Sequence, residues 1–248
     1  MSDSRADGLV LRGEGLTKSF NALLVLDRVD FSVHAREAVG VVGPNGAGKT
    51  TLLSVLVGAH APTSGRVRFL GEDVTQLPTA ERCRRGLART HQIPRPFSGM
   101  TVFENVFTAA AHGGRLEREA AYRRTIESLS LTGMTAIANR RAETLGLIDR
   151  KRLELARALA TDPAVLLLDE VAGGLTEREC HALIELIRDV RQSGVSIIWI
   201  EHVVHALIAS IDRLLVLHNG AFIAAGDPAT VIKSPQVAEI YMGIEADA

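Results

Sequence analysis

Residues 39–51 read VGVVGPNGAGKTT, so a short apolar segment, a glycine-rich turn and a Lys-Thr-Thr sequence follow one another directly. Glycines between Gly43 and Lys49 let backbone N–H groups converge on an anion, and a helix beginning near Lys49 adds the positive end of its dipole. Lys49 then reaches the β- and γ-phosphates of a nucleotide, and the Thr50 hydroxyl ligates Mg²⁺. The GxxxxGK[ST] pattern between strand and helix predicts a phosphate-binding loop, in preference to a simple connecting turn. Its predicted nucleotide-binding residues are Gly43, Pro44, Asn45, Gly46, Ala47, Gly48, Lys49, Thr50 and Thr51.

The composition is that of an ordinary globular protein. Hydrophobic residues make up 46% of the 248 positions, which is ample for a buried core. Twenty-eight Lys and Arg against 29 Asp and Glu give a net charge of −1, so no overall field favours nucleic acid or an anionic membrane. We therefore expect no nucleic-acid partner. The apolar runs at residues 164–168 and 195–200 are far shorter than the roughly 20 residues of a membrane-spanning helix.

Targeting and redox signals indicate a cytosolic setting. The first eight residues are polar and acidic without an apolar segment, so we expect no secretory signal. Cys83 and Cys180 are far apart and lack CxxC spacing, which suits a reducing compartment and predicts neither a disulfide framework nor a metal site. A membrane role would then depend on a partner protein.

The order of sequence patterns predicts an α/β fold. Residues 9–31 alternate short apolar segments with turn residues, which indicates a small β layer near the N-terminus. The continuous apolar runs at 165–168 and 195–200 are typical of parallel strands covered on both faces, and helical spacing over 178–193 connects them. Residues 101–160 contain helical stretches, including 117–131 and 150–160, and no convincing strand, which indicates an inserted helical lobe. Near the C-terminus, Asn219-Gly220 predicts a tight hairpin turn and Asp227-Pro228 the start of a capped helix.

Two carboxylates follow the apolar run at 165–168. Asp169 and Glu170 stand at the carboxyl end of this strand, the edge at which open α/β sheets present ligands. Asp169 suits direct or indirect support of Mg²⁺, and Glu170 suits polarisation of the attacking water. Many strands end in acidic residues, so the pair alone is a weak signal. It indicates a nucleotide site only in combination with the phosphate loop. Neither carboxylate needs to be buried for these roles.

With these features the sequence resembles the ATP-binding subunits of ABC transporters over nearly its whole length. The further stretches that carry the resemblance are PTSG at 62–65, RTHQ at 89–92, MTVFENV at 100–106, RLELARAL at 152–159, IEH at 200–202 and VLHNG at 216–220. The resemblance implies a P-loop NTPase core of the RecA-like kind, with an N-terminal antiparallel β layer and an inserted α-helical subdomain. One ABC ATP-binding domain would occupy residues 1–248, with the RecA-like and β lobe at about 1–92 and 161–248 and the helical subdomain at about 93–160.

The resemblance also assigns roles to individual residues. Gln92 would sense Mg²⁺ or the lytic water and relay the nucleotide state, and His202 would contact the γ-phosphate, so the implied catalytic residues are Glu170, His202 and Gln92. The implied metal-supporting residues are Thr50, Gln92 and Asp169. Phe20 matches the aromatic residue that stacks on adenine, and packing as an ordinary strand aromatic is the alternative.

The chain departs from the family pattern at its signature turn. In place of an LSGGQ-like sequence it has the degenerate turn Leu145, Gly146, Leu147, Ile148 and Asp149. In an ABC dimer this turn meets the γ-phosphate held by the opposite subunit. A β-branched Ile148 prevents the close backbone approach that glycine permits, and an Asp149 carboxylate repels a polyphosphate. Thr176 likewise occupies a position where the family often has Asp. We therefore hypothesise a different ATPase subunit as partner, with a homodimer that tolerates this turn as the alternative.

Basic residues form two further groups whose function stays open. They are Arg82, Arg84, Arg85 and Arg89 in one group and Arg140, Arg141, Arg150, Lys151 and Arg152 in the other. Such runs are most often solvated faces.

Among ABC ATPases the chain most resembles those of branched-chain amino acid importers, through RTHQ at 89–92 with MTV at 100–102, DRKRLELAR at 149–157 and AEIYMG at 238–243. This implies a peripheral ATPase on the cytoplasmic face of the membrane that uses ATP and Mg²⁺. Its partners would be two transmembrane permease subunits, a second ABC ATPase subunit and, indirectly, an extracytoplasmic solute-binding protein. The alternatives are an importer or exporter ATPase for another solute and a low-turnover, nucleotide-gated regulatory subunit. A soluble ABC ATPase acting on DNA or ribosomes fits less well, because the chain has neither a long coiled-coil insertion nor a second cassette.

Overall fold

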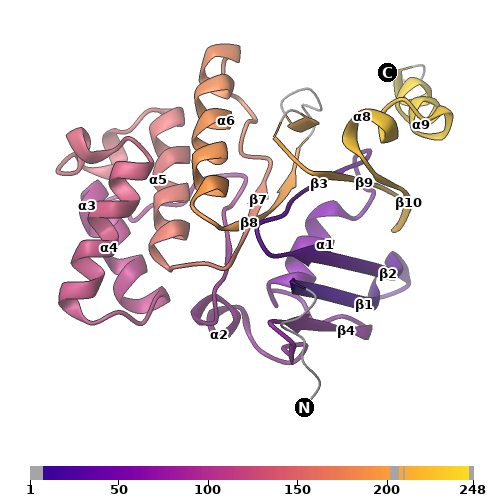
Figure 1. Cartoon of the computed structure of the whole chain (residues 1–248), viewed down its shortest axis with the longest axis horizontal. Coiled ribbons are helices and arrows are strands. Elements are labelled where there is room, and N and C mark those ends of the chain that lie inside the picture. The colour runs from indigo at the N-terminus through magenta and orange to yellow at the C-terminus, as the bar shows by residue number, and fades with distance from the viewer. Residues whose placement is uncertain (1–7, 202–206, 209, 246–248) are drawn as a thin grey trace. The chain divides into compact units, whose positions relative to one another are not determined.

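The computed structural model describes residues 8–201, 207–208 and 210–245. The chain forms two compact units (Figure 1). The first consists of Met1–Leu77 and Ser196–Ala248, and the second is Pro78–Val195.

An antiparallel sheet forms one layer of the first unit. Its strands lie in the order β2-β1-β4-β5, with the bounds β1 Leu9–Phe20, β2 Leu23–His34, β4 Ser64–Phe69 and β5 Glu72–Asp73. Along β2 buried residues alternate with exposed or partly exposed ones from Val29 to His34, as expected for a strand with one face on the core. The antiparallel pairing of β1 with both β2 and β4 forms the β layer expected near the N-terminus.

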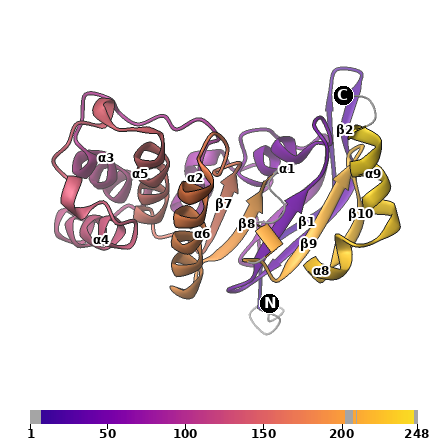
Figure 2. The same cartoon turned by 90° about the horizontal axis from the view of Figure 1, so that it is seen from above.

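A second layer of this unit carries the apolar strand that precedes the phosphate loop. Its strands lie in the order β10-β9-β3-β8, with the bounds β3 Ala38–Val42, β8 Ser196–Ile200, β9 Arg213–His218 and β10 Ala221–Gly226. All five residues of β3 are buried, and β3 pairs in parallel with β8 and β9. Phe31 of β2 and Phe222 of β10 lie with ring centroids 6.2 Å apart, so the two layers pack against each other (Figure 2).

The turns and helices of the first unit follow the sequence signals. Asn219 and Gly220 have φ angles of 45° and 77°, which is the geometry of a tight hairpin between β9 and β10. Asp227 accepts a hydrogen bond from the Thr230 N–H and caps α8, with Pro228 at its first position. Both elements are therefore as predicted. The helices are α1 Lys49–Leu56, α8 Pro228–Val231 and α9 Pro235–Glu245.

The second unit joins a pair of parallel strands to a group of helices. β6 (Leu87–Arg89) pairs in parallel with β7 (Val165–Asp169), and Arg89 lies opposite Leu167. The helices are α2 Thr79–Arg84, α3 Val102–Thr108, α4 Arg118–Leu131, α5 Leu147–Ala160 and α6 Glu177–Gln192, with a π-helical turn at Ala109–Gly113 and 3₁₀ turns at Thr135–Ile137 and Ala142–Thr144. The predicted helices at 117–131 and 178–193 are thus present, with no bound shifted by more than one residue.

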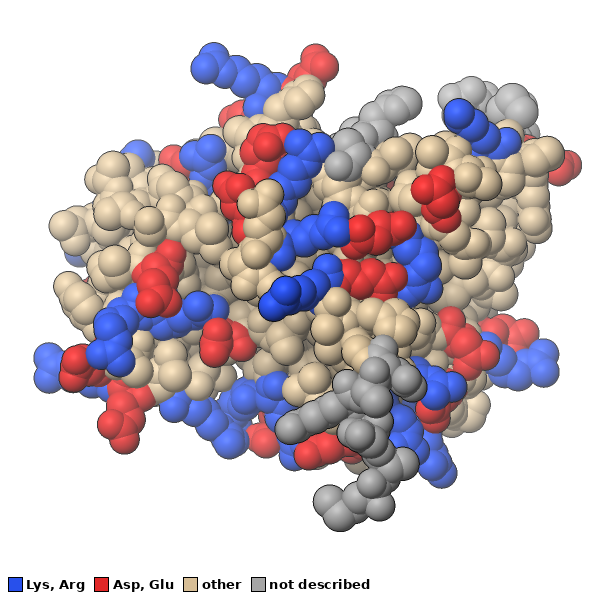
Figure 3. Space-filling view, viewed as in Figure 1, with Lys and Arg blue, Asp and Glu red and all other residues tan. Residues whose placement is uncertain are grey.

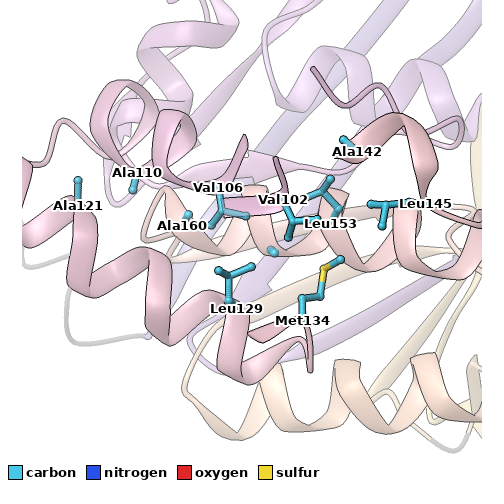
Figure 4. Close-up of a cluster of buried hydrophobic side chains, with 11 residues drawn as sticks. Val102, Val106, Ala110, Ala121, Leu129, Met134, Ala142, Leu145, Leu153 and Ala160 are labelled. Carbon is cyan, nitrogen blue, oxygen red and sulfur yellow. The ribbon is translucent and has the colours of Figure 1, made fainter. Parts of the chain in front are cut away.

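Helices α3, α4 and α5 pack around one apolar cluster (Figure 4). Val106 of α3, Leu129 of α4 and Leu153 of α5 are fully buried in it, together with Met134 from the turn after α4. Burial of such side chains contributes roughly 1.5–3 kcal/mol each. This cluster therefore holds α3, α4 and α5 together within the unit.

Two helices of this unit begin with matching caps. Thr101 before α3 and Thr176 before α6 each accept a hydrogen bond from the backbone N–H three residues later, and Glu104 and Glu179 accept hydrogen bonds in return. The bonds that the two threonines donate stabilise the ionised carboxylates and lower the pKa of both Glu104 and Glu179. The starts of α3 and α6 are therefore fixed by local hydrogen bonds.

Acidic and basic side chains are interspersed on the face shown in Figure 3. Among the helices of the described residues, none has both the length and the apolar character needed to cross a membrane.

Candidate functional site

The glycine-rich loop runs from the end of β3 to the start of α1 and needs glycine at two close approaches. A Cβ atom on Gly43 would lie 2.0 Å from the Leu217 carbonyl oxygen, and one on Gly48 would lie 2.8 Å from the Val25 carbonyl oxygen. Gly48 also has a φ of 104° and is the N-cap of α1, where it supplies no capping side chain. A helix start without a capping side chain is suited to binding an anion such as a phosphate.

Lys49 brings a buried ammonium group to this loop. Its side chain donates hydrogen bonds from Nζ to the carbonyl oxygens of Gly43, at 2.7 Å, and Pro44, at 3.0 Å. Thr50, in the same first turn of α1, is exposed, and a Cβ atom on Gly46 would meet no other atom within 4 Å. The loop therefore combines open space above Gly46, a helix N-terminus and the positive charge of Lys49. This combination fits a polyphosphate.

Phe20 lies at the end of β1 with 39% of its surface exposed. Lys18 Nζ lies 4.8 Å from the centre of its ring, and the His60 ring meets it edge-on at 5.3 Å. Its exposure leaves ring surface for an adenine base, while the contacts with Lys18 and His60 are ordinary packing. Stacking on adenine stays a prediction.

Asp169 and Glu170 differ in their surroundings. Asp169 ends the buried strand β7, and its side chain is only 4% exposed, whereas Glu170 follows with a φ of 46° and is partly exposed. The Arg89 guanidinium donates a hydrogen bond from Nη2 to Asp169 Oδ2 at 2.6 Å. The other oxygen, Oδ1, is buried and has no hydrogen-bond partner among the described residues. An unpartnered buried carboxylate oxygen fits a hard cation such as Mg²⁺.

Gln92 and Glu170, two of the predicted catalytic residues, are in direct contact. Gln92 Nε2 donates a hydrogen bond to Glu170 Oε2. The segment that carries Gln92 is tied to α5, because Glu154 Oε1 lies 2.8 Å from His91 Nδ1 and Arg157 donates a hydrogen bond to the Arg95 carbonyl oxygen. Sequence reasoning did not single out Glu154 or Arg157 for this anchoring role.

A cavity of about 300 Å³ lies beside this anchored segment. Its lining includes Cys83, His91, Phe97, His112 and Arg157. Burial raises the pKa of the Cys83 thiol.

Comparison with known proteins assigns the family. The family model described as "ABC transporter" matches residues 26–173, more than half of the chain. The chain belongs to the ABC transporter family. The high-affinity branched-chain amino acid transport ATP-binding protein BraF of Pseudomonas aeruginosa is 35% identical over 94% of this chain and 98% of its own.

Other relatives agree with this assignment. The lipopolysaccharide export system ATP-binding protein LptB of Acidithiobacillus ferridurans is 33% identical over 94% of this chain and 97% of its own. A solved ATP-binding cassette of an ABC transporter in its ADP conformation is 30% identical, covers 95% of this chain and 99% of its own, and has a TM-score of 0.85. The predicted family, α/β fold and transport-coupled ATPase class are therefore confirmed.

Within the ABC fold of this chain, the signature turn is the beginning of a helix. Gly146 is the N-cap of α5, with φ −69° and ψ 173°, and Leu147 is already its first residue, so the predicted start at residue 150 was too late. Leu145 is buried in the apolar cluster of the helices. Asp149 lies in the first turn and forms an ion pair with Arg152 at 3.7 Å, so the helix N-terminus already has a negative charge close to it.

Thr176, the second departure from the ABC pattern, has a structural explanation. It is the N-cap of α6, and Thr is a good substitute for Asp at that position. His202, the predicted γ-phosphate contact, lies outside the described residues.

Proposed function

We propose that this ABC ATPase works at the cytoplasmic face of a membrane and drives the import of branched-chain or related amino acids. The observation that carries the proposal is the 35% identity to BraF, which extends over 94% of this chain and 98% of the relative. An archaeal relative, the probable branched-chain amino acid transport ATP-binding protein LivG of Archaeoglobus fulgidus, is 32% identical over a similar extent. The fold of the ATPase is thus accompanied by similarity of the whole sequence to amino acid transport subunits.

The proposed nucleotide is ATP with Mg²⁺. We assign the phosphates to residues 43–51, the adenine to Phe20 and the γ-phosphate contact to His202. Thr50, Gln92 and Asp169 are the residues that would hold the metal, since each offers an oxygen atom and Asp169 Oδ1 is buried without a hydrogen-bond partner among the described residues. When bound, Mg²⁺ neutralises charge on the β- and γ-phosphates.

Glu170 is the proposed group that polarises the attacking water. Its carboxylate is an acceptor for the water proton, and the hydrogen bond from Gln92 Nε2 to Oε2 helps to orient that carboxylate. Gln92 in turn belongs to the segment held by Glu154 and Arg157 of α5. We propose that this segment, with the adjoining cavity and the helical lobe at about 93–160, passes the nucleotide state to two transmembrane permease subunits.

The degenerate turn favours a second, non-identical ATPase subunit as partner, because Ile148 and Asp149 stand where an opposing phosphate would approach. Replacing Gly146 by Ser and Ile148 by Gly is expected to increase ATP turnover of the isolated chain by about tenfold. Gly146→Ser fits, since a Cβ atom there meets nothing within 4 Å and Ser is a favoured N-cap. Steady-state phosphate release, with thermal unfolding to verify folding, measures the effect.

Gly99→Ser is the matched control, because a Cβ atom at Gly99 also meets nothing within 4 Å. Rapid turnover by the unmodified chain alone, unaltered by the double substitution, would show that a homodimer is competent and remove the reason for a different partner.

Uptake measurements test the proposed function. Cells that lack this chain should lose uptake of radiolabelled leucine, isoleucine and valine, and the chain should restore it while Glu170→Gln should not. The similarity to LptB favours an exporter as the second candidate. Normal amino acid uptake together with impaired lipopolysaccharide export would reject the importer and support that candidate.

A further inference from the structure

Arg89 and Asp169 meet because of the pairing between β6 and β7. Arg89 lies opposite Leu167 in the parallel register, and Asp169 is two residues beyond Leu167 in the same strand. Paired residues share a face of a sheet, and so do residues two apart in a strand. The side chains of Arg89 and Asp169 therefore project from the same face, where Nη2 and Oδ2 lie 2.6 Å apart.

This ion pair is shielded from solvent. The side chain of Arg89 is 15% exposed and that of Asp169 is 4% exposed. A carboxylate in such surroundings is costly without a compensating charge, and the Arg89 guanidinium supplies that charge. Arg89 therefore does not belong to a solvated basic face, which is where such runs of basic residues most often lie.

The two oxygens of Asp169 are used unequally. Oδ2 accepts the hydrogen bond from Arg89, and Oδ1 is buried with no hydrogen-bond partner among the described residues. Native proteins leave few buried polar atoms unpaired, so Oδ1 has the character of a ligand atom held ready for a cation. The bond at Oδ2 fixes the carboxylate in the orientation that leaves Oδ1 unused.

We propose that Arg89 is a positioning residue that acts as the resident counterion of Asp169 and sets how tightly magnesium is held. The inference rests on the proposed Mg²⁺–ATP function. In the metal-free protein Arg89 compensates the Asp169 carboxylate. When the metal binds, the guanidinium is a second positive charge close to the same carboxylate, and Coulomb repulsion weakens the binding of Mg²⁺. Arg89 thus lowers magnesium affinity while it stabilises the metal-free state.

Arg89→Met separates this role from simple packing. With a fluorescent, non-hydrolysable ATP analogue as probe, the Mg²⁺ concentration for half-saturation should fall by about tenfold in Arg89→Met, because the repulsion is removed. Binding of the analogue in EDTA should stay unchanged, and Arg89→Lys should stay near the wild type because it keeps the charge. An unchanged or higher half-saturating Mg²⁺ concentration in Arg89→Met would overturn the proposal.

Thermal unfolding gives a second readout that does not depend on turnover. In EDTA, Arg89→Met should unfold at a lower temperature than the wild type, and Mg²⁺ with the analogue should raise its Tm by more than it raises the wild-type Tm. Arg123→Met is the matched control, because Arg123 forms an exposed ion pair with Glu119 on α4 and should leave both values unaltered. Equal magnesium-dependent Tm shifts in Arg89→Met and the wild type would contradict the counterion role.

The same experiments distinguish this inference from the proposed function. A wild-type chain that does not bind the analogue even with Mg²⁺ would contradict the proposed function itself. Wild-type binding with a normal magnesium response in Arg89→Met would contradict only the role of Arg89. If Arg89→Met does not fold, Arg89→Gln removes the charge and keeps a polar side chain. It should likewise show a lower half-saturating Mg²⁺ concentration and a larger magnesium-dependent rise in Tm than the wild type.

Discussion

Glu170→Gln is expected to lower ATP turnover by about 10³-fold while ATP binding persists. The amide has nearly the shape of the carboxylate but accepts the proton of the attacking water poorly. Its carbonyl oxygen remains an acceptor for the Gln92 Nε2 donor, so the contact between the two residues survives the substitution. The loss should therefore appear in kcat, with little change in the KM for ATP. Phosphate release by the assembled transporter and retention of radiolabelled ATP measure the two quantities.

Glu177→Gln provides the control for this prediction. Glu177 is an exposed residue in the first turn of α6, a few residues after Glu170, and the same chemical change there should leave turnover within about twofold. Accumulation of an ATP-bound dimer in Glu170→Gln would add direct support. Turnover of Glu170→Gln at the wild-type rate would remove Glu170 from its assigned role.

Lys49→Met is expected to weaken ATP binding by about 100-fold. The substitution removes the ammonium that would contact the β- and γ-phosphates. It also removes the donor that holds the Gly43 and Pro44 carbonyl oxygens at 2.7 and 3.0 Å, so the loop loses part of its internal support. Calorimetric titration with Mg²⁺–ATP measures the affinity.

Lys233→Met is the matched control, since Lys233 is exposed and lies beyond α8 in the same unit. Its ATP affinity should equal that of the wild type. A folded Lys49→Met protein with ATP affinity within threefold of the wild type would be incompatible with the proposed phosphate contact.

Local chemistry explains which parts of the fold the sequence predicted. The phosphate loop depends on glycines at positions such as Gly43 and Gly48, where neighbouring carbonyl groups exclude a Cβ atom. Asn219 and Gly220 adopt positive φ angles in the hairpin that their dipeptide predicts. The signals for the loop and the hairpin each lie within a few consecutive residues. The carbonyl groups that exclude a Cβ atom at Gly43 and Gly48 belong to Leu217 and Val25, so these contacts are seen only in the structure.

The start of α5 shows where such local reasoning was insufficient. The helical pattern predicted a helix over residues 150–160, yet the first turn is formed by residues 147–149. Gly146 serves as N-cap through its backbone conformation alone, without a side-chain signal in the sequence. Leu145 is buried among the helices, so tertiary packing helps to fix the position of the turn before α5.

The contacts of Asp169 and Glu170, at the end of β7, could be found only in the three-dimensional structure. Arg89 and Asp169 are 80 positions apart in the chain, and only the register of β6 against β7 brings them to one face. The predicted role of Asp169 in supporting Mg²⁺ did not require its side chain to be buried. Asp169 is buried because it is the last residue of β7, a strand in which all five residues are buried. Within the described residues the structure adds the Gln92–Glu170 contact, while the role of His202 stays a prediction.

The most direct test of the account is whether the intact chain, together with its membrane partners, retains ATP in a magnesium-dependent way and then releases the γ-phosphate. ATP labelled at the γ-position and supplied at concentrations on the order of millimolar is the suitable substrate. We expect retention in Mg²⁺, release of labelled phosphate over time, and release that is slower by about 10³-fold in Glu170→Gln. Absence of retained nucleotide under these conditions would contradict the proposed binding and hydrolysis of Mg²⁺–ATP by this chain.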